Sequence, residues 1–266
     1  MVEVFRCVRD VLADDGTLWL NIGDSYAANG RSGLNTGWAD RAKEYAGGGH
    51  RAEPSRHRGE KRVPEGLKQK DLIGIPWMLA FALRADGWYL RQDIIWHKPN
   101  PMPESVRDRC TKAHEYIFLL SKSERYFFDS EAMKEPAVSE KPAGHKRHKY
   151  ADAYAAGKSE EHRTKAGLLS LASVEWQKRN RRSVWTVATK PYKGAHFATF
   201  PPALIEPCIL AGSRPGDIVL DPFMGSGTTA ATALNLGRRY LGCELNQEYK
   251  PLQQERINAA VGPLFA

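Results

Sequence analysis

Hydrophobic residues in the first half of the chain alternate between helical and strand spacing. Residues 2–12 repeat at helical spacing and lead into a short apolar strand at 17–22. A second helix is expected over 71–83, whose first residue, an aspartate, can cap it by accepting hydrogen bonds from free N–H groups. Apolar runs at 92–96 and 115–120 predict two further strands.

The pattern is more regular from Pro201 onward. It predicts, in order, a helix, a strand, a glycine-containing loop, a helix, a strand and a last helix. The expected bounds are 202–211 and 217–220 for the first helix and strand, 227–236 and 239–243 for the second pair, and Asn246 for the start of the last helix. Alternating helices and nearly continuous apolar strands are typical of a parallel sheet with helices on both faces. The sequence therefore predicts an α/β protein.

Two segments, 27–70 and 130–195, show no regular period and are rich in Lys and Arg. Residues 31–70 hold 10 Lys/Arg against 5 Asp/Glu, and residues 130–195 hold 14 against 7, whereas the whole chain has a net charge of +8. The rest of the chain is therefore slightly acidic. Basic segments on a near-neutral body favour a polyanion such as DNA as the partner, because each Lys or Arg that neutralises a phosphate releases a counterion.

The composition excludes several classes of protein. With 266 residues, 42% of them hydrophobic and 26% charged, the chain can bury a core as one large domain or two small ones. No apolar run approaches the ~18 residues of a membrane span, and the first residues lack a signal-peptide pattern. We therefore expect a protein of the cytoplasm with no membrane partner.

The cysteine spacing matches neither a zinc site nor a compact disulfide framework. The four cysteines are Cys7, Cys110, Cys208 and Cys243. We expect them to be free, buried thiols. A histidine pair in 144–149 is surrounded by basic residues and not by other metal ligands, so no metal site is expected.

The most specific motif is 221–229, Asp-Pro-Phe-Met-Gly-Ser-Gly-Thr-Thr, between a predicted strand and a predicted helix. Gly225 and Gly227 let the backbone approach a ligand closely, and the helix start beyond them offers free N–H groups. Glu244 follows the next strand, where an acidic side chain can accept hydrogen bonds from ribose hydroxyls. The motif thus predicts a site for a nucleoside-containing cofactor.

The same glycines, with Ala230, also satisfy the dinucleotide fingerprint of NAD-dependent oxidoreductases. A Walker A loop is excluded because no lysine follows the glycines. A dinucleotide fold begins with this unit and needs several strands after it, whereas here only one further strand follows. The other strands must come from the N-terminal half, so the sheet is circularly rearranged.

Four sequence motifs, in the order in which they occur along this chain, resemble those of bacterial and phage DNA amino-methyltransferases of the beta order. They are 221–229, 196–201, 18–26 and 94–103, and the resemblance covers nearly the whole chain except the two basic segments. It implies a Rossmann-like sheet that binds S-adenosylmethionine as methyl donor and acts on an exocyclic amino group of a base in double-stranded DNA. It also implies a restriction–modification system with a restriction endonuclease as partner.

The resemblance assigns domains and site residues. It implies a discontinuous methyltransferase domain of 1–129 and 196–266, DNA target recognition by 130–195, and a basic flexible insertion at 27–70. The residues implied for the cofactor are Asp221, Phe223, Gly225, Ser226, Gly227 and Thr228 around its methionine part, Glu244 at its ribose, and His196, Phe197, Thr199, Phe200 and Pro201 on the other side of the pocket.

Candidate DNA contacts come from basic and polar residues in the segments that face the predicted cleft. Those expected to contact DNA are Lys98, Asn100, Lys146, Arg147, Arg179, Arg181 and Arg182. Trp176, Trp185 and Tyr192 are interleaved with some of them and could either stack on bases or anchor a small core.

One motif that the family requires is absent. Its tetrapeptide, Asp/Asn/Ser-Pro-Pro-aromatic, stacks the flipped base and polarises the amine, which is a poor nucleophile. The nearest string, at 200–203, is Phe-Pro-Pro-Ala. We expect an N-terminally shortened enzyme rather than a natural variant, which leaves Asp24 and Tyr26, after the strand at 17–22, as the only catalytic candidates.

The missing tetrapeptide leaves the acceptor base open. We favour N4 of cytosine over N6 of adenine from the surviving motifs. Two alternatives stand beside the methyltransferase: a non-catalytic adaptor that binds S-adenosylmethionine and DNA, and an NAD-dependent oxidoreductase.

Overall fold

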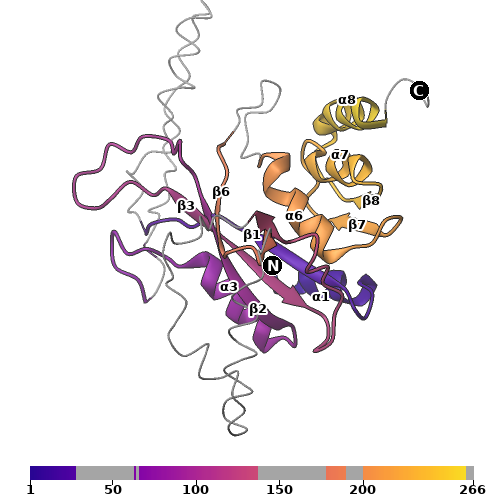
Figure 1. The fold of residues 1–266 in the computed structure, drawn as a ribbon. Helices are drawn as coiled ribbons and strands as arrows, with labels where there is room; N and C mark the ends of the chain where they lie inside the picture. The colour runs from indigo at the N-terminus through magenta and orange to yellow at the C-terminus, as the bar shows by residue number, and fades with distance from the viewer. Residues whose placement is uncertain (28–62, 64–65, 137–177, 190–199, 262–266) are drawn as a thin grey trace, which may run out of the picture. The chain divides into compact units, whose positions relative to one another are not determined.

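The computed structural model describes residues 1–27, 63, 66–136, 178–189 and 200–261 (Figure 1). They form two compact units, one of 1–97 with 101–126 and the other of 98–100 with 127–266. Most of the predicted insertion at 27–70, and the helical patch expected near 168–177, lie outside the described residues.

The first unit contains an antiparallel sheet with the strand order β1-β3-β2. Its strands are β1 (Thr17–Asn21), β2 (Tyr89–His97) and β3 (His114–Ser121). The prediction of parallel strands is wrong for this part of the chain. Residues 98–113, which join β2 to β3, contain no helix, and parallel neighbours need a long crossover connection, usually a helix.

Two helices precede strands of this sheet, at α1 (Val2–Val11) and α3 (Ile75–Ala85). The prediction that Asp71 begins the second helix is wrong by four residues. Gly74, with φ of 80°, turns the chain into the helix. Asp71 instead accepts a hydrogen bond from the Lys68 backbone N–H at 2.8 Å, and this bond holds the pKa of its carboxyl below the ordinary value.

The core of the first unit lies between α3 and the central strand β3. Leu83, Phe118 and Leu120 are fully buried, and Ile94 of β2 is 2% exposed. The Trp77 ring meets the Phe118 ring edge-on, with 4.9 Å between the centroids. Large apolar side chains from elements far apart in sequence therefore fix α3 on the sheet.

The second unit contains the regular C-terminal pattern. Its helices and strands are α6 (Pro202–Gly212), β7 (Ile218–Asp221), α7 (Thr228–Asn235), β8 (Arg239–Gly242), a 3₁₀ turn η1 (Gln247–Tyr249) and α8 (Lys250–Val261). β7 and β8 are parallel, as predicted. Short strands β4 (Glu135–Pro136), β5 (Lys178–Arg179) and β6 (Val184–Thr186) also belong to this unit.

A buried arginine, missed by the sequence analysis, connects two turns of this C-terminal region. Arg238 is 8% exposed, and its guanidinium donates to the backbone oxygens of Ser213 at 2.8 Å and of Leu236 at 2.6 Å. A buried charge needs such hydrogen bonds. The residue that follows α6 is thus tied to the turn between α7 and β8.

The described cysteines are all free, but only Cys208 is buried. Cys7, Cys110 and Cys243 are exposed, so the prediction of four buried thiols is wrong for three of them. Burial raises the pKa of the Cys208 thiol far above its ordinary value. Within the described ranges, no helix is long and apolar enough to cross a membrane, and no three His, Cys, Asp or Glu side chains gather as metal ligands.

Candidate cofactor and DNA sites

The glycine loop between β7 and α7 has the backbone conformation that its sequence predicts. Gly225 and Gly227 have φ of 53° and 82°, in the left-handed region that favours glycine. The Gly227 N–H donates to the Met224 carbonyl at 3.0 Å, and α7 begins at the next residue. The loop therefore turns sharply before the start of a helix, where backbone N–H groups are free for a ligand.

Glu244, two residues after the end of β8, reaches this loop. Its Oε2 accepts from the Gly225 N–H at 2.8 Å and its Oε1 from the Asn246 N–H at 2.8 Å. The residue is exposed, and a carboxylate has more acceptor positions than these two bonds occupy. The side chain can therefore accept ribose hydroxyls while it holds the loop.

Asp221 shapes the loop from its other end. Its Oδ1 accepts from the Phe223 N–H at 3.0 Å, and its Oδ2 accepts from the Thr229 hydroxyl at 2.5 Å. These bonds join the end of β7 to the first turn of α7. The aspartate thus holds both ends of the turn in place.

The other residues predicted to bind the cofactor differ in their exposure to solvent. Ser226, Gly227 and Thr228 are buried, whereas the Phe223 side chain is 55% exposed. Phe200 is half-buried and Pro201, which precedes α6, is buried. His196, Phe197 and Thr199 lie outside the described residues. The structure brings together the loop, Asp221 and Glu244, and of the other side of the predicted pocket it describes only Phe200 and Pro201.

Asp24, one of the two catalytic candidates, caps a helix. Its Oδ1 accepts from the backbone N–H groups of Gly74 at 2.9 Å and of Ile75 at 3.0 Å. These groups have no partner within α3, so the carboxylate satisfies the helix start that the sequence assigned to Asp71. A catalytic role of Asp24 stays a prediction.

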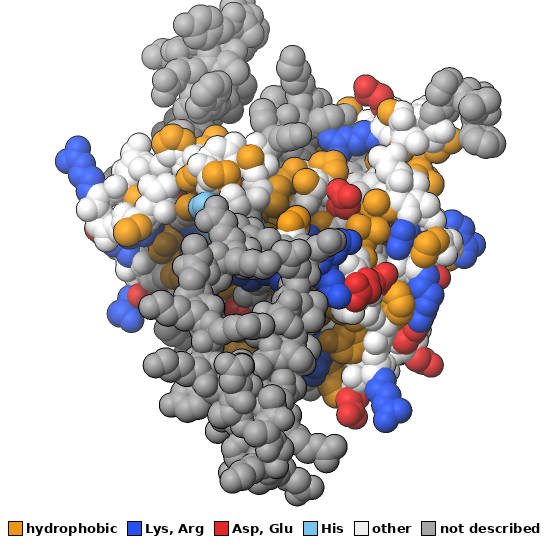
Figure 2. Space-filling model, viewed as in Figure 1, with side chains coloured by type: hydrophobic (Ala, Val, Ile, Leu, Met, Phe, Trp, Pro, Cys, Tyr) orange, Lys and Arg blue, Asp and Glu red, His pale blue; other side chains and the backbone are white. Residues whose placement is uncertain are grey.

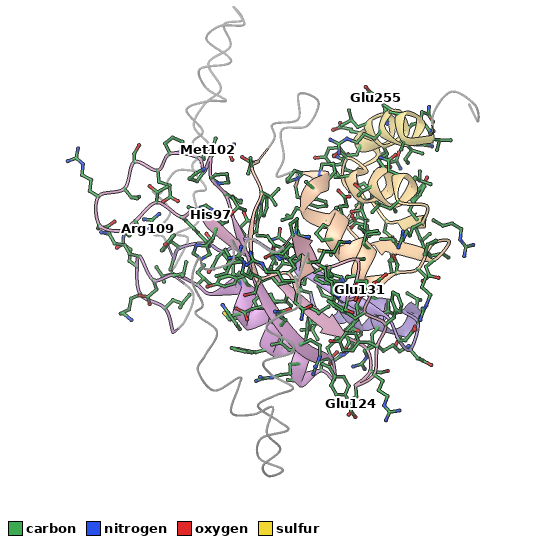
Figure 3. The ribbon with its side chains drawn as sticks, in the orientation of Figure 1. His97, Met102, Arg109, Glu124, Glu131 and Glu255 are labelled. Carbon is green, nitrogen blue, oxygen red and sulfur yellow. The ribbon has the colours of Figure 1, made fainter. Side chains whose placement is uncertain are left out.

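Tyr26, the other candidate, has one ring face covered. The Arg109 guanidinium lies 4.0 Å from the ring centroid, and Arg109 also pairs with Glu104 at 2.8 Å. Arg109 belongs to the connection between β2 and β3 (Figure 3). A base could not stack on the ring face that the guanidinium occupies.

Two of the predicted DNA-binding arginines share one carboxylate. Glu135 Oε1 accepts from Arg179 Nε at 2.9 Å and from Arg182 Nε at 3.1 Å. Burial works against the charged carboxylate, but the two hydrogen bonds outweigh it and hold the pKa of Glu135 below its ordinary value. The carboxylate is therefore charged at neutral pH and offsets part of the basic charge.

The other DNA candidates have mixed surroundings. Arg181 lies over the ring of Trp185, which is 4% exposed, so Trp185 anchors a core. The Asn100 amide both donates to the Thr189 carbonyl and accepts from its N–H, at 3.0 Å each. Lys98 is half-buried, and Lys146 and Arg147 lie outside the described residues. On the face drawn in Figure 2, described basic and acidic side chains are intermixed.

Comparison with known proteins identifies this chain as a DNA methylase. The family model for DNA methylases matches residues 1–255, and the chain belongs to this family. Over 257 residues it is 49% identical to the Type II methyltransferase M.SmaI of Serratia marcescens and 46% identical to M.Cfr9I of Citrobacter freundii. These matches cover 97% of this chain and 72% and 70% of the two relatives.

Solved structures show the same fold. PvuII DNA methyltransferase (cytosine-N4-specific) aligns with a TM-score of 0.58 at 17% identity, over 100% of this chain and 72% of that chain. A putative DNA modification methylase of Thermus thermophilus, complexed with S-adenosyl-L-methionine, aligns with a TM-score of 0.54 at 22% identity, over 99% and 77%. The family match and the Type II relatives thereby confirm the predicted class, a DNA methyltransferase.

Proposed function

We propose that this methyltransferase modifies N4 of cytosine at a specific site in double-stranded DNA. Its membership of the DNA methylase family carries the reaction class. The preference for N4 is supported by the likeness to the PvuII enzyme, whose name states that acceptor. N6 of adenine is the alternative within the same family.

The cofactor site that we propose is the glycine loop with Glu244. S-adenosylmethionine supplies an electrophilic methyl group when bound. The Glu244 carboxylate would accept hydrogen bonds from its ribose, and the loop at Gly225 and Gly227 would let the backbone approach it closely. The hydrogen bonds of Asp221 and Glu244 to the loop support this assignment, because they hold its conformation ready.

Modified-base sequencing tests the acceptor. The DNA of cells that carry the gene together with its upstream reading frame should contain N4-methylcytosine at one recognition sequence, and deletion of the gene should remove it. Loss of N6-methyladenine instead would assign adenine as the acceptor. An unchanged modification pattern would favour the non-catalytic adaptor. The absence of the tetrapeptide from the sequence supports this alternative.

We place DNA target recognition in 130–195, and Arg179 and Arg182 give it a test. Replacing either arginine by glutamine should weaken DNA binding and reduce the slope of log Kd against log salt by about 1 for each lost phosphate contact. Glu135→Gln should strengthen binding, because it removes the negative charge that both guanidinium groups now contact. Filter binding at several salt concentrations measures these effects.

Arg84→Gln is the matched control, since it removes the same charge from α3 in the other unit. Its salt slope should equal that of the unmodified protein. Equal slopes for the Arg179 and Arg182 variants as well would exclude both residues from phosphate contact.

The likeness to Type II methyltransferases also supports a second protein, an endonuclease, as a functional partner. We infer a restriction endonuclease with the same recognition sequence, against which this methylation protects the cell's DNA. Because its substrate is DNA, we place the protein in the cytoplasm, where bacterial DNA lies.

A further inference from the structure

Helix α8 lies alongside α7 in the second unit (Figure 1), although its sequence gives it little reason to pack there. None of its residues is fully buried. Its half-buried residues form one stripe at helical spacing, made of Leu252, Gln253, Arg256, Ile257 and Ala260. Two of these five are polar, so polar contacts must account for part of the attachment.

Both polar residues of the stripe contact the glycine loop or the start of α7. Gln253 Nε2 donates to the Gly225 carbonyl at 2.7 Å. Arg256 Nη1 donates to the hydroxyl of Thr228, the first residue of α7. The two donors are three residues apart and therefore lie on the same side of α8.

The backbone of α8 also lies directly against the loop. A Cβ added at Gly227 would lie 3.2 Å from the Cα of Gln253 and 3.5 Å from its Cβ. Two features thus require glycine at position 227: its left-handed backbone conformation and the close approach of α8. The geometry of the loop is consequently determined from two sides, by Glu244 at the Gly225 N–H and by Gln253 at the Gly225 carbonyl.

We propose that Gln253 and Arg256 are positioning residues of the cofactor site, and that docking of α8 is coupled to cofactor binding. This inference rests on the proposed placement of S-adenosylmethionine at the loop. Gln253 fixes the peptide that follows Gly225, and Arg256 fixes the first residue of α7. Coupling is reciprocal, so a cofactor that favours the ordered loop also favours docked α8.

The decisive comparison is between two neighbouring glutamines. Gln253→Ala removes the bond to the loop, whereas Gln254→Ala removes only a bond to Asn258 within α8. Gln253→Ala should weaken binding of S-adenosylhomocysteine about fivefold, the value expected for one hydrogen bond. Gln254→Ala should leave the Kd unchanged, as should Glu255→Ala, whose side chain lies on the side of α8 away from α7 (Figure 3). Isothermal titration calorimetry measures each Kd.

Hydrogen exchange separates positioning from mere stability. In the unmodified protein, S-adenosylhomocysteine should slow amide exchange both in the loop and across Lys250–Val261. In Gln253→Ala combined with Arg256→Met, the ligand should no longer protect α8, while the affinity for DNA stays the same. Arg256→Lys should retain part of the protection, because it keeps one donor.

Each outcome decides between the proposals. Absence of S-adenosylhomocysteine binding in the unmodified protein would overturn the proposed cofactor site. Normal binding in the unmodified protein with the same Kd in Gln253→Ala and Gln254→Ala would overturn only the role of α8. A fall in Tm that is equal in both glutamine variants, with equal loss of DNA binding, would show that α8 contributes stability alone.

Discussion

The chain of 266 residues, assayed by itself, is expected to bind S-adenosylhomocysteine and to transfer no measurable methyl group to DNA. The exocyclic amine of a base is a poor nucleophile, and losing one preorganised polar group at a reacting centre typically costs ~10²–10³ in rate. The sequence holds no Asp/Asn/Ser-Pro-Pro-aromatic tetrapeptide. Asp24, the candidate replacement, uses one carboxylate oxygen to cap α3. Transfer of tritiated methyl groups from S-adenosylmethionine to DNA measures the rate.

Two controls make a negative result informative. Calorimetry with S-adenosylhomocysteine shows that the cofactor site is formed, and filter binding shows that DNA is bound. Rapid turnover would contradict the expectation and direct attention to Asp24. In that case Asp24→Asn separates a catalytic role from the capping of α3, because asparagine caps a helix about as well as aspartate but carries no charge.

Gly227→Val is expected to abolish cofactor binding, with a loss of at least about 100-fold in affinity. A left-handed conformation costs a residue with a Cβ ~1–2 kcal/mol, and at Gly227 the φ is 82°. The new side chain would in addition meet the backbone of Gln253, with the first added atom already 3.2 Å from its Cα. The loop, the start of α7 and α8 cannot all keep their places, so the proposed cofactor site is lost.

Gly216→Val is the matched control for this substitution. Gly216 has φ of 83°, and a Cβ there would meet no atom within 4 Å. Both variants therefore have the same backbone strain, and this strain should lower the Tm of each by a similar amount. Only Gly227→Val should lose binding of S-adenosylhomocysteine in calorimetry. Equal affinities for the two variants would show that the cofactor does not use this loop.

Prediction from sequence succeeded where the determining contacts are local. The four elements from α6 to β8 lie within one residue of their predicted bounds, because turn residues and short apolar runs mark each end. The last helix, predicted from Asn246, begins at Lys250, because the 3₁₀ turn η1 comes first. The conformations of Gly225 and Gly227 followed from their place between a strand and a helix. Glu244 was predicted to hold a ribose from its spacing to the glycines; that role stays a prediction, and the structure places its carboxylate at the Gly225 N–H.

Prediction failed where a residue acts on a distant part of the chain. Asp24 caps a helix that begins 51 residues later, and no local signal distinguishes it from Asp71, which lies closer to the helix and has the same capping chemistry. Sequence reasoning likewise missed the ion pairs of Glu135 with arginines 44 and 47 residues away. DNA contact by Arg179 and Arg182 stays a prediction, and it now has to take this carboxylate into account.

The sequence by itself determined the family, the conformation of the glycine loop and the order of helices and strands in the C-terminal region, because these depend on motifs and on periodicity within short windows. Only the tertiary structure decided the direction of β3 between β1 and β2, the helix that Asp24 caps and the contact of α8 with the loop. Strand direction depends on the path of the connection, and the other two depend on hydrogen bonds between segments 28 or more residues apart. Such pairings are set by how the whole chain packs, which no local pattern encodes.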